Sequence, residues 1–420
     1  MKKGVIEGFY GIPWSFEEKM SMIGFLSEIG MDQYIYAPKD DPYHNQKWRV
    51  PYPAEELEKI RASADLSREK KLEFTWAIHP GQNPFDFGDY DKEISKIFAK
   101  YRQMMGAGVR SFGLCLDDID KNIAYEKRFD HLKLIRDLAD FVEKETGNGL
   151  YFVHPWYNDA WIDQNGYEYE GLLKDIKNLK VMWTGSQVVD PINHKSNQDF
   201  FKRTGKKPYI WFNWPVNDYR PDKIFLESFE FYDSREINFD GFYLNPMNQA
   251  EASKIAIYQA NEYLKNPLAY RPEDAFRKAV DFLEPKASGD LIKIAPSFYG
   301  SLVYQRTVAK QFTEDMEIKK AFEEKNKEKL KILLEDKISA IENYRTNYAN
   351  EDLYREIKPF IESLENLAKA VLAKLDGNKS QAQKAYEKAK NIEIQVLGEN
   401  GLEKIRVKTS GILEEIYEKN

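Results

Sequence analysis

The sequence predicts an α/β protein in which a (β/α)8 barrel, the TIM-barrel fold, is followed by an α-helical bundle domain. In the first two-thirds of the chain, short runs rich in β-branched and aromatic residues alternate with amphipathic helical patterns. This alternation is typical of βα units and a parallel sheet. From residue 270 onward the pattern is helical almost throughout. The chain has 420 residues, which are too many for one hydrophobic core, so two domains are expected.

A closed barrel of this kind needs eight parallel strands, and the sequence offers eight. The predicted strands cover residues 4–10, 33–37, 73–78, 111–116, 150–154, 180–184, 209–212 and 241–244. The competing fold is an open doubly wound sheet, which would carry a glycine-rich phosphate-binding turn after its first strand. Gly8-Phe9-Tyr10-Gly11 lacks the G-x-G-x-x-G spacing, so the closed barrel is favoured.

Amphipathic helices are predicted between these strands. The clearest cover residues 15–29, 53–69, 94–105, 128–146 and 249–264. In the last of them, Ala252, Ile255, Ala256 and Ala260 recur in helical register, as expected for a helix with one apolar face.

The composition changes near Asn266-Pro267, which places the barrel domain at residues 1–268 and the helical domain at 269–420. Helices are predicted there over residues 275–283, 292–307, 312–324, 326–345, 353–374 and 381–393. Within 326–345, one face collects Leu330, Leu333, Leu334, Ile338 and Ile341. The last twenty or so residues are polar, and we expect them to be loosely ordered.

Composition excludes several classes of protein. The chain is 42% hydrophobic and 31% charged, as in ordinary globular proteins, and its net charge of −7 offers no basic surface for nucleic acid. A single cysteine, Cys115, excludes an internal disulfide, and its apolar neighbours predict a buried structural thiol. No apolar run could span a membrane, and no signal peptide is visible. We therefore expect a cytoplasmic protein, or a secreted one if a leader was removed.

The predicted strand ends are rich in polar and aromatic groups, and these ends carry the reactive groups in a (β/α)8 barrel. The segments concerned are residues 8–11, 38–41, 79, 117–118, 154–157, 211–218 and 245–249. They contain one cation, Lys39, and several carboxylates. Such a mixture suits a polyhydroxylated substrate between aromatic walls, and it suits a phosphate poorly.

The adjacent acids Asp117 and Asp118 are the sharpest chemical feature. Two carboxylates this close cannot both ionise cheaply, so one pKa is expected to rise while the other stays low. Neighbours in sequence cannot easily flank a sugar ring from opposite sides, as the two acids of a common retaining glycosidase do. The pair therefore suggests that a carbonyl of the substrate is the nucleophile. Two other roles remain open at this point: capping a loop, or holding a calcium ion.

A metal site would have to draw on His44, His79 and His154, with Asp118 as a fourth ligand. A metal-dependent amidohydrolase would carry an H-x-H pair at the end of strand one, and residues 7–11 contain no histidine. We expect no metal and no cofactor, and we expect these imidazoles to hydrogen-bond barrel loops.

Five segments in the barrel region resemble the O-GlcNAcase-type β-N-acetylglucosaminidases of glycoside hydrolase family 84. They are GVIEGFYGIPWS at 4–15, YAPKDDPYH at 36–44, LDDI at 116–119, WFNWPVNDY at 211–219 and LNPMNQAE at 244–251. They occur in the family's order over residues 4–265. The helical region also resembles the domain that follows the family's barrel.

The resemblance implies three catalytic residues. Asp117 matches the residue that accepts a hydrogen bond from the acetamido N–H of the substrate. Asp118 matches the general acid that later acts as the general base. Tyr157 matches the tyrosine that donates a hydrogen bond to the acetamido oxygen.

The resemblance also implies residues that bind the sugar. Trp211 would form a wall of the acetamido pocket, and Asn213 would support the acetyl group or the catalytic pair. The other implied residues hold the sugar hydroxyls, namely Gly8, Lys39, Asp218 and Asn245, or shape the pocket, namely Phe9 and Tyr10.

The implied activity is that of a retaining exo-β-N-acetylglucosaminidase that releases terminal β-linked GlcNAc, including O-GlcNAc on proteins, through an oxazoline-like intermediate. Its partners would be N-acetylglucosaminides on glycoproteins or oligosaccharides, with no nucleic acid or membrane involved. One alternative is a non-catalytic GlcNAc-binding or scaffold protein that retains the pocket. Another is an enzyme of the same mechanism that acts on hyaluronan or chitin fragments.

Overall fold

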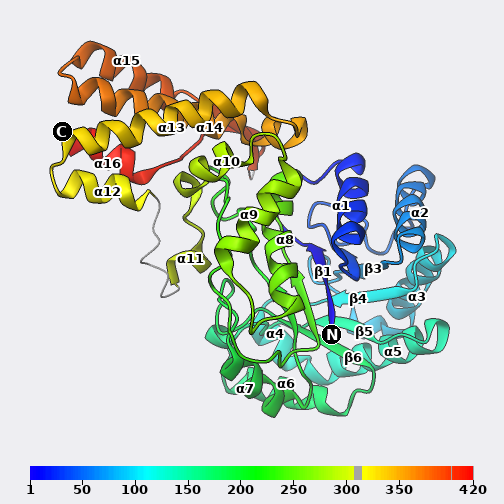
Figure 1. Ribbon diagram of the computed structural model, residues 1–420. Coiled ribbons are helices and arrows are strands. Elements are labelled where there is room, and N and C mark those ends of the chain that lie inside the picture. Colours follow the sequence, from blue (N-terminus) through cyan, green and yellow to red (C-terminus); the bar gives the residue numbers. More distant parts are fainter. Residues whose placement is uncertain (307–314, 399, 420) are drawn as a thin grey trace. The chain divides into compact units, whose positions relative to one another are not determined.

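The computed structural model describes residues 1–306, 315–398 and 400–419 (Figure 1). The chain forms two compact units. Unit 1 comprises Met1–Trp214 and Tyr232–Pro246, and unit 2 comprises Pro215–Phe231 and Met247–Asn420. The domain division between residues 268 and 269 stays a prediction, because compactness alone does not define a domain.

Unit 1 contains a closed barrel of eight parallel strands in the order β1 to β8, which confirms the predicted fold class. The strands are β1 Lys2–Glu7, β2 Gln33–Tyr36, β3 Glu73–Ile78, β4 Ser111–Cys115, β5 Leu150–Val153, β6 Leu179–Trp183, β7 Tyr209–Phe212 and β8 Gly241–Leu244. The barrel closes where β1 pairs with β8, in a register that sets Val5 opposite Leu244.

In the sequence, the helices of unit 1 alternate with these strands. They are α1 Phe16–Ile29, α2 Ala54–Glu69, α3 Tyr90–Gly106, α4 Lys121–Glu126, α5 Arg128–Thr146, α6 Gln164–Leu172 and α7 His194–Thr204, with short 3-10 turns at Phe87–Asp89, Asp159–Trp161 and Leu173–Asp175. The start of α1 follows from its sequence. The Ser15 hydroxyl accepts a hydrogen bond from Glu18 N, and the Glu18 side chain accepts one from Ser15 N, so two otherwise unpaired amides are satisfied.

Apolar side chains and one polar cluster fill the barrel. The apolar core includes Ile6, Ile35, Ala37, Ala77, Cys115, Tyr151, Val153, Met182, Trp211 and Tyr243. Gln33 supplies the polar centre, because its Oε1 accepts hydrogen bonds from the hydroxyls of Tyr151 at 2.9 Å and Tyr243 at 2.7 Å. Cys115 is buried, and that burial raises the pKa of its thiol.

Unit 2 is mainly helical, as predicted for the region after the barrel. Its helices are α8 Ala250–Lys265, α9 Pro272–Leu283, α10 Ser288–Ile294, a 3-10 turn at Ala295–Phe298, α11 Leu302–Arg306, α12 Met316–Glu323, α13 Lys327–Asn347, α14 Glu351–Leu375, α15 Lys379–Lys390 and α16 Gly411–Lys419. Residues 307 and 312–314 of two predicted helices lie outside the described residues. No described helix is both long and apolar enough to cross a membrane.

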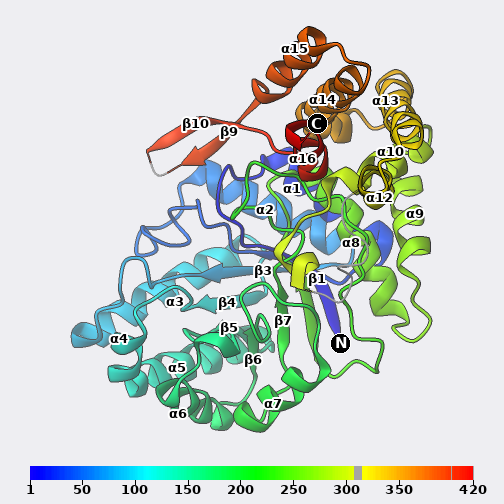
Figure 2. The same cartoon turned by 90° about the vertical axis from the view of Figure 1, so that its left-hand side faces the viewer.

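One part of unit 2 differs from the prediction. The predicted helix 381–393 ends at Lys390, and Glu393 begins an antiparallel hairpin of β9 Glu393–Gly398 and β10 Gly401–Arg406 (Figure 2). Ile394 and Val396 alternate with polar residues, which is the pattern of a strand with one packed face. Residues 401–419, where looser order was expected, contain β10 and α16.

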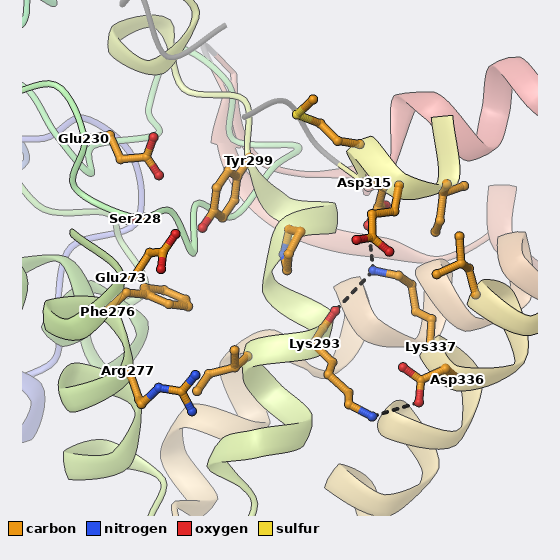
Figure 3. Close-up of a pocket in the computed structure, with 16 residues that line it drawn as sticks. Ser228, Glu230, Glu273, Phe276, Arg277, Lys293, Tyr299, Asp315, Asp336 and Lys337 are labelled. Atoms are coloured by element: carbon orange, nitrogen blue, oxygen red, sulfur yellow. Dashed lines mark hydrogen bonds and ion pairs between the residues drawn. The ribbon is translucent and has the colours of Figure 1, made fainter. Parts of the chain in front are cut away.

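Unit 2 also holds a cavity of about 490 Å³ with an ion pair in its wall (Figure 3). Lys337 and Asp315 are both buried, and Nζ of Lys337 lies 2.6 Å from Oδ1 of Asp315. The same ammonium donates to Oγ of Ser297 at 2.7 Å. Beside them, the exposed pair of Lys293 and Asp336 has an N–O distance of 2.8 Å.

Candidate active site

Asp117 and Asp118 lie just beyond the end of β4, after Leu116, but their surroundings differ. Asp117 is buried, and its Oδ2 accepts a hydrogen bond from Nζ of Lys39 at 2.6 Å. Asp118 is exposed and has φ of 55°, in the left-handed region that non-glycine residues rarely occupy. Such strain is common at functional sites, and here it turns consecutive carboxylates toward different partners.

Asp117 is held in its ionised form. Burial acts to raise the pKa of Asp117, but the neighbouring Lys39 and His79 side chains outweigh it and hold the pKa well below its usual range. For Lys39, burial acts to lower the pKa, and the Asp117 charge raises it above its usual value. The two groups therefore form a buried ion pair whose members are both charged.

Asp118 accepts hydrogen bonds from two tyrosines. The hydroxyl of Tyr10 donates to Oδ2 at 2.9 Å, and the hydroxyl of Tyr157 donates to Oδ1 at 3.0 Å. Burial and then the negative charge of Asp118 raise the pKa of Tyr157, so its phenol stays protonated as a donor.

The side chains of Asn213 and Asn245 directly follow β7 and β8 and form a hydrogen-bonded chain. Oδ1 of Asn213 accepts from Nε1 of Trp211 and from Nδ2 of Asn245, both at 2.9 Å. Oδ1 of Asn245 in turn accepts from the backbone N–H of Gly8 at 3.3 Å. Nδ2 of Asn213 donates to the carbonyl of Val188 at 2.7 Å, which fixes the orientation of its amide.

Aromatic rings surround the Lys39 ammonium. It lies 5.7 Å from the centre of the Trp211 ring and 5.6 Å from that of Tyr10. Gly8 lies against Trp211, because a Cβ atom on residue 8 would overlap the indole ring. The backbone just after β1 therefore approaches the ring as only glycine allows.

The structure thus brings most of the predicted site residues into two linked groups. The first contains Asp117, Asp118, Lys39, Tyr10 and Tyr157, and the second contains Gly8, Trp211, Asn213 and Asn245. Lys39 links the groups through its approach to Trp211.

The other two predicted residues are Phe9 and Asp218. Phe9 is buried against Trp14, with ring centres 5.4 Å apart. Asp218 belongs to unit 2. The roles of all these residues in binding and catalysis stay predictions.

The three histidines near the strand ends make separate polar contacts, although the ring centres of His44 and His79 are only 6.1 Å apart. Nε2 of His79 is 3.3 Å from Oδ1 of Asp117, Nδ1 of His44 donates to the carbonyl of Ala77 at 2.7 Å, and His154 faces Glu170 at 3.8 Å. Among the described residues, no group of three or more His, Cys, Asp or Glu side chains is arranged to hold a metal ion.

Sequence reasoning missed two contacts of the site: the approach of His79 to Asp117 and the role of the Val188 carbonyl as a partner of Asn213. A signal existed for His79, since it directly follows β3 and so lies at a strand end. None existed for Val188, because any residue has a backbone carbonyl.

A closed parallel barrel with paired acids and with aromatic and amide groups at its strand ends is an arrangement found in glycoside hydrolases. The sequence profile described as beta-N-acetylglucosaminidase matches residues 3–295. The chain belongs to this family, and its resemblance to the O-GlcNAcase-type enzymes of glycoside hydrolase family 84 is confirmed.

Curated relatives include the Protein O-GlcNAcase of Rattus norvegicus and that of Mus musculus. Each is 32% identical to this chain over 277 residues, which are 63% of this chain and 30% of the relative. The chain therefore spans less than a third of the length of these relatives.

Solved structures of the family are similar over the whole chain. The structure of CpGH84D has a TM-score of 0.84 and 26% identity, and the match covers 99% of this chain and 74% of that one. A mutant of the Thermobaculum terrenum O-GlcNAc hydrolase has a TM-score of 0.81, with coverage of 100% and 94%. Its identity is 23%, so this likeness shows the fold alone.

Proposed function

We propose that this protein is a retaining exo-β-N-acetylglucosaminidase that releases terminal β-linked GlcNAc, including O-GlcNAc on proteins. The observation that carries the proposal is the contrast between two consecutive acids. Asp117 is buried and ion-paired with Lys39, whereas Asp118 is exposed and bound by two tyrosine hydroxyls. One acid is thereby suited to remain an anion, and the other to exchange a proton with a substrate.

In the first step, the carbonyl oxygen of the substrate's acetamido group attacks C1 of the sugar. The bond from C1 to the aglycone oxygen breaks, and Asp118 gives its proton to that oxygen as general acid. The product of this step is an oxazoline-like ring. Asp117 accepts the hydrogen bond of the acetamido N–H and stabilises the positive charge that develops on the group.

In the second step, Asp118 acts as general base and takes a proton from water. The water oxygen attacks C1, and the bond from C1 to the acetamido oxygen breaks. Two displacements at C1 give net retention of configuration, and the acetamido group is regenerated.

Tyr157 would change partner during this cycle. Its hydroxyl donates to Asp118 in the structure, and in the proposed complex it donates to the acetamido oxygen. Asp118 would then keep the hydrogen bond from the Tyr10 hydroxyl.

The remaining predicted residues would bind the sugar. In this proposal Trp211 and Asn213 form the acetamido pocket. The hydroxyl groups are held by Gly8, Lys39, Asp218 and Asn245, and Phe9 and Tyr10 shape the entrance.

Hydrolysis of a 4-nitrophenyl β-N-acetylglucosaminide tests the proposal. We expect turnover by the wild type and a loss of kcat/KM of at least about 100-fold in Asp118→Ala, because general acid–base catalysis contributes about 10²–10⁴-fold. Asp120→Asn is the matched control, since Asp120 lies on the same loop and its side chain caps α4. Equal turnover by wild type and Asp118→Ala would overturn the assignment. So would tight binding of GlcNAc with no turnover, which would indicate a binding protein.

The nature of the nucleophile is tested with substrates whose N-acetyl group carries one, two or three fluorine atoms. A trifluoroacetyl group makes the amide carbonyl a poorer nucleophile, so kcat/KM should fall steeply as fluorine atoms are added. Rates that do not change with fluorination, or inversion at C1 in the released sugar as seen by NMR, would contradict substrate-assisted catalysis.

A further inference from the structure

The proposed mechanism accounts for one contact of Asp117 and leaves a second unexplained. Oδ2 of Asp117 is bound by Lys39, and on the other side of the carboxylate Nε2 of His79 lies 3.3 Å from Oδ1. In the described part of the chain, Oδ1 of Asp117 and both nitrogens of His79 are buried and have no hydrogen-bond partner, so the facing Oδ1 and Nε2 are an acceptor and a potential donor that nothing else satisfies. The His79 side chain is 1% exposed, so no bulk water replaces these partners.

The backbone on both sides of His79 is held in place. The N–H of His79 donates to the carbonyl of His44 at 2.8 Å, and Nδ1 of His44 donates to the carbonyl of Ala77 at 2.7 Å. Next along the chain, Nδ2 of Asn45 donates to the carbonyl of Lys39 at 2.6 Å. The segment at residues 44–45 therefore ties Lys39 and His79, the two groups that flank Asp117, to each other.

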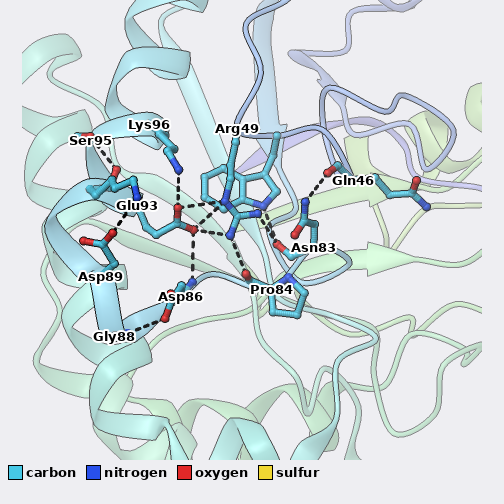
Figure 4. Close-up of polar contacts among 12 residues, drawn as sticks. Gln46, Arg49, Asn83, Pro84, Asp86, Gly88, Asp89, Glu93, Ser95 and Lys96 are labelled. Atoms are coloured by element: carbon cyan, nitrogen blue, oxygen red, sulfur yellow. Dashed lines mark hydrogen bonds and ion pairs between the residues drawn. The ribbon is translucent and has the colours of Figure 1, made fainter.

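The loop that follows His79 is also held in place, by an ion pair and several hydrogen bonds (Figure 4). Arg49 forms an ion pair with Glu93 at the start of α3 and donates to the carbonyls of Asn83 at 3.2 Å and Pro84 at 2.8 Å. Nδ2 of Asn83 donates in return to the carbonyl of Gln46 at 2.8 Å. These bonds fix the loop after β3 against the loop after β2.

The loop after β3 passes close to the His79 ring. A Cβ atom on Gly81 would lie 3.0 Å from Cε1 of His79, which is closer than side chains normally approach. Glycine at position 81 therefore allows this close approach of the loop to the imidazole.

We propose that His79 is a positioning residue that orients the Asp117 carboxylate by donating its Nε2–H to Oδ1 while Lys39 holds Oδ2. A carboxylate only accepts hydrogen bonds, so Nε2 must carry the hydrogen in this arrangement. With both oxygens held, the plane of the carboxylate is fixed, and one lone pair is aimed at the acetamido N–H of the sugar. This inference rests on the proposed function, in which Asp117 binds that N–H.

The first experiment compares three variants of His79 on a 4-nitrophenyl GlcNAc glycoside. His79→Leu removes the donor and should lower kcat/KM about 10- to 100-fold, the effect of losing one hydrogen bond to a charged group. In His79→Gln the side-chain amide nitrogen can reach the place of Nε2, so most of the activity should return. In His79→Asn the nitrogen reaches only the place of Nδ1, and activity should stay low.

Wild-type rates in all three variants would overturn the inference. Recovery by Asn equal to that by Gln would also overturn it, because the position of the donor would then be irrelevant. Thermal unfolding of each variant checks the fold. His131→Phe is the matched control for replacing a buried barrel histidine, and it should leave kcat/KM unchanged, since His131 lies on α5 with its Nδ1 at 3.2 Å from the Tyr169 hydroxyl.

A double-mutant cycle separates positioning of Asp117 from a general structural role. If His79 acts through Asp117, then His79→Leu should cost less than about threefold in the Asp117→Asn background, measured with a substrate that has an activated leaving group. The same fold-loss in both backgrounds would contradict the inference. Failure of the proposed function is recognised separately, because the wild type would then not release GlcNAc at all.

Discussion

At Gly8 the backbone just after β1 comes close to the Trp211 ring of the candidate site. Because a Cβ atom at this position would overlap that ring, Gly8→Ala must displace either the ring or the backbone after β1. We expect kcat/KM on a GlcNAc glycoside to fall about 10- to 100-fold, since small misplacements at a reacting centre are costly.

Gly24→Ala is the control for this substitution. Gly24 lies within α1, where a Cβ atom would meet open space. Alanine should leave kcat/KM unchanged and stabilise the helix by about 0.5–1 kcal/mol. Equal activities for Gly8→Ala and Gly24→Ala would contradict the close approach of Gly8 to Trp211.

His131 makes the stability of the protein depend on pH. Burial holds the pKa of His131 at about 4, whereas a histidine in the unfolded chain titrates near pH 6.5. Between these values the unfolded chain binds the extra proton, so the free energy of unfolding falls as the pH is lowered from 6.5 to 4. Within that pH window, protonation of His131 lowers the free energy of unfolding by up to about 1.4 kcal/mol for each unit by which the pH falls.

The measurement is urea unfolding of wild type and His131→Phe at pH 7 and at pH 4.5. Phenylalanine can keep the ring contacts with Phe87 and Tyr169, and it cannot titrate. The decrease in unfolding free energy between the two pH values should be about 1–3 kcal/mol smaller in the variant. An equal decrease in both proteins would contradict a buried neutral His131.

At the scale of single residues, the sequence indicated residues that lie just beyond the ends of strands. Lys39, Asp117 and Asp118 could be chosen because parallel strands bring their carboxyl ends together. The partners of each acid could not be derived, since they depend on side-chain directions: Asp118 turns to Tyr10 and Tyr157 through its positive φ, which nothing in the sequence indicates.

Among the elements, α1 has the most complete local signal for its start. The reciprocal hydrogen bonds between Ser15 and Glu18 satisfy two backbone amides in the first turn. Ser15→Ala should lower the free energy of unfolding by about 1 kcal/mol, measured by urea titration. Ser15→Asp is the control, since aspartate also caps helices, and it should restore most of the loss. No difference between Ala and Asp would contradict a capping role.

The eight barrel strands were predictable because each is a short apolar run bounded by polar or turn residues. The hairpin of β9 and β10 was missed for the opposite reason. Its strands are half-exposed and rich in Glu, Gln and Lys, and they follow a helix of similar composition. An alternation carried by Ile394 and Val396 alone is too short to outweigh a helical context.

For the whole molecule, the count of eight strands predicted closure, but it did not predict how the chain divides into units. Residues 215–231 lie between β7 and β8 in sequence and belong to unit 2. Within that unit, Glu227 accepts hydrogen bonds from the backbone amides of Gly300 and Ser301, both at 2.6 Å. Contacts over more than 70 residues leave no periodic pattern in the sequence.

The stability of unit 2 depends on its buried ion pair. Lys337→Met would leave Asp315 buried without its cation, at a cost of about 3–5 kcal/mol. Amide hydrogen exchange of α10 and α13 should therefore become faster. Lys293→Met breaks an exposed pair of the same kind and should cost less than about 1 kcal/mol. Similar exchange rates in the two variants would contradict the expectation that the buried ion pair stabilises unit 2 more than the exposed one.

The single cysteine gives the barrel a built-in reporter. Because Cys115 is 3% exposed and burial keeps its thiol from ionising, thiol-directed reagents can modify it only when the barrel opens. The rate at which the wild-type protein is labelled therefore measures how often the barrel opens. A second cysteine at an exposed helical position of unit 2, such as Ile332, would be the only one to react quickly, which allows a single dye to be attached without removing any native residue.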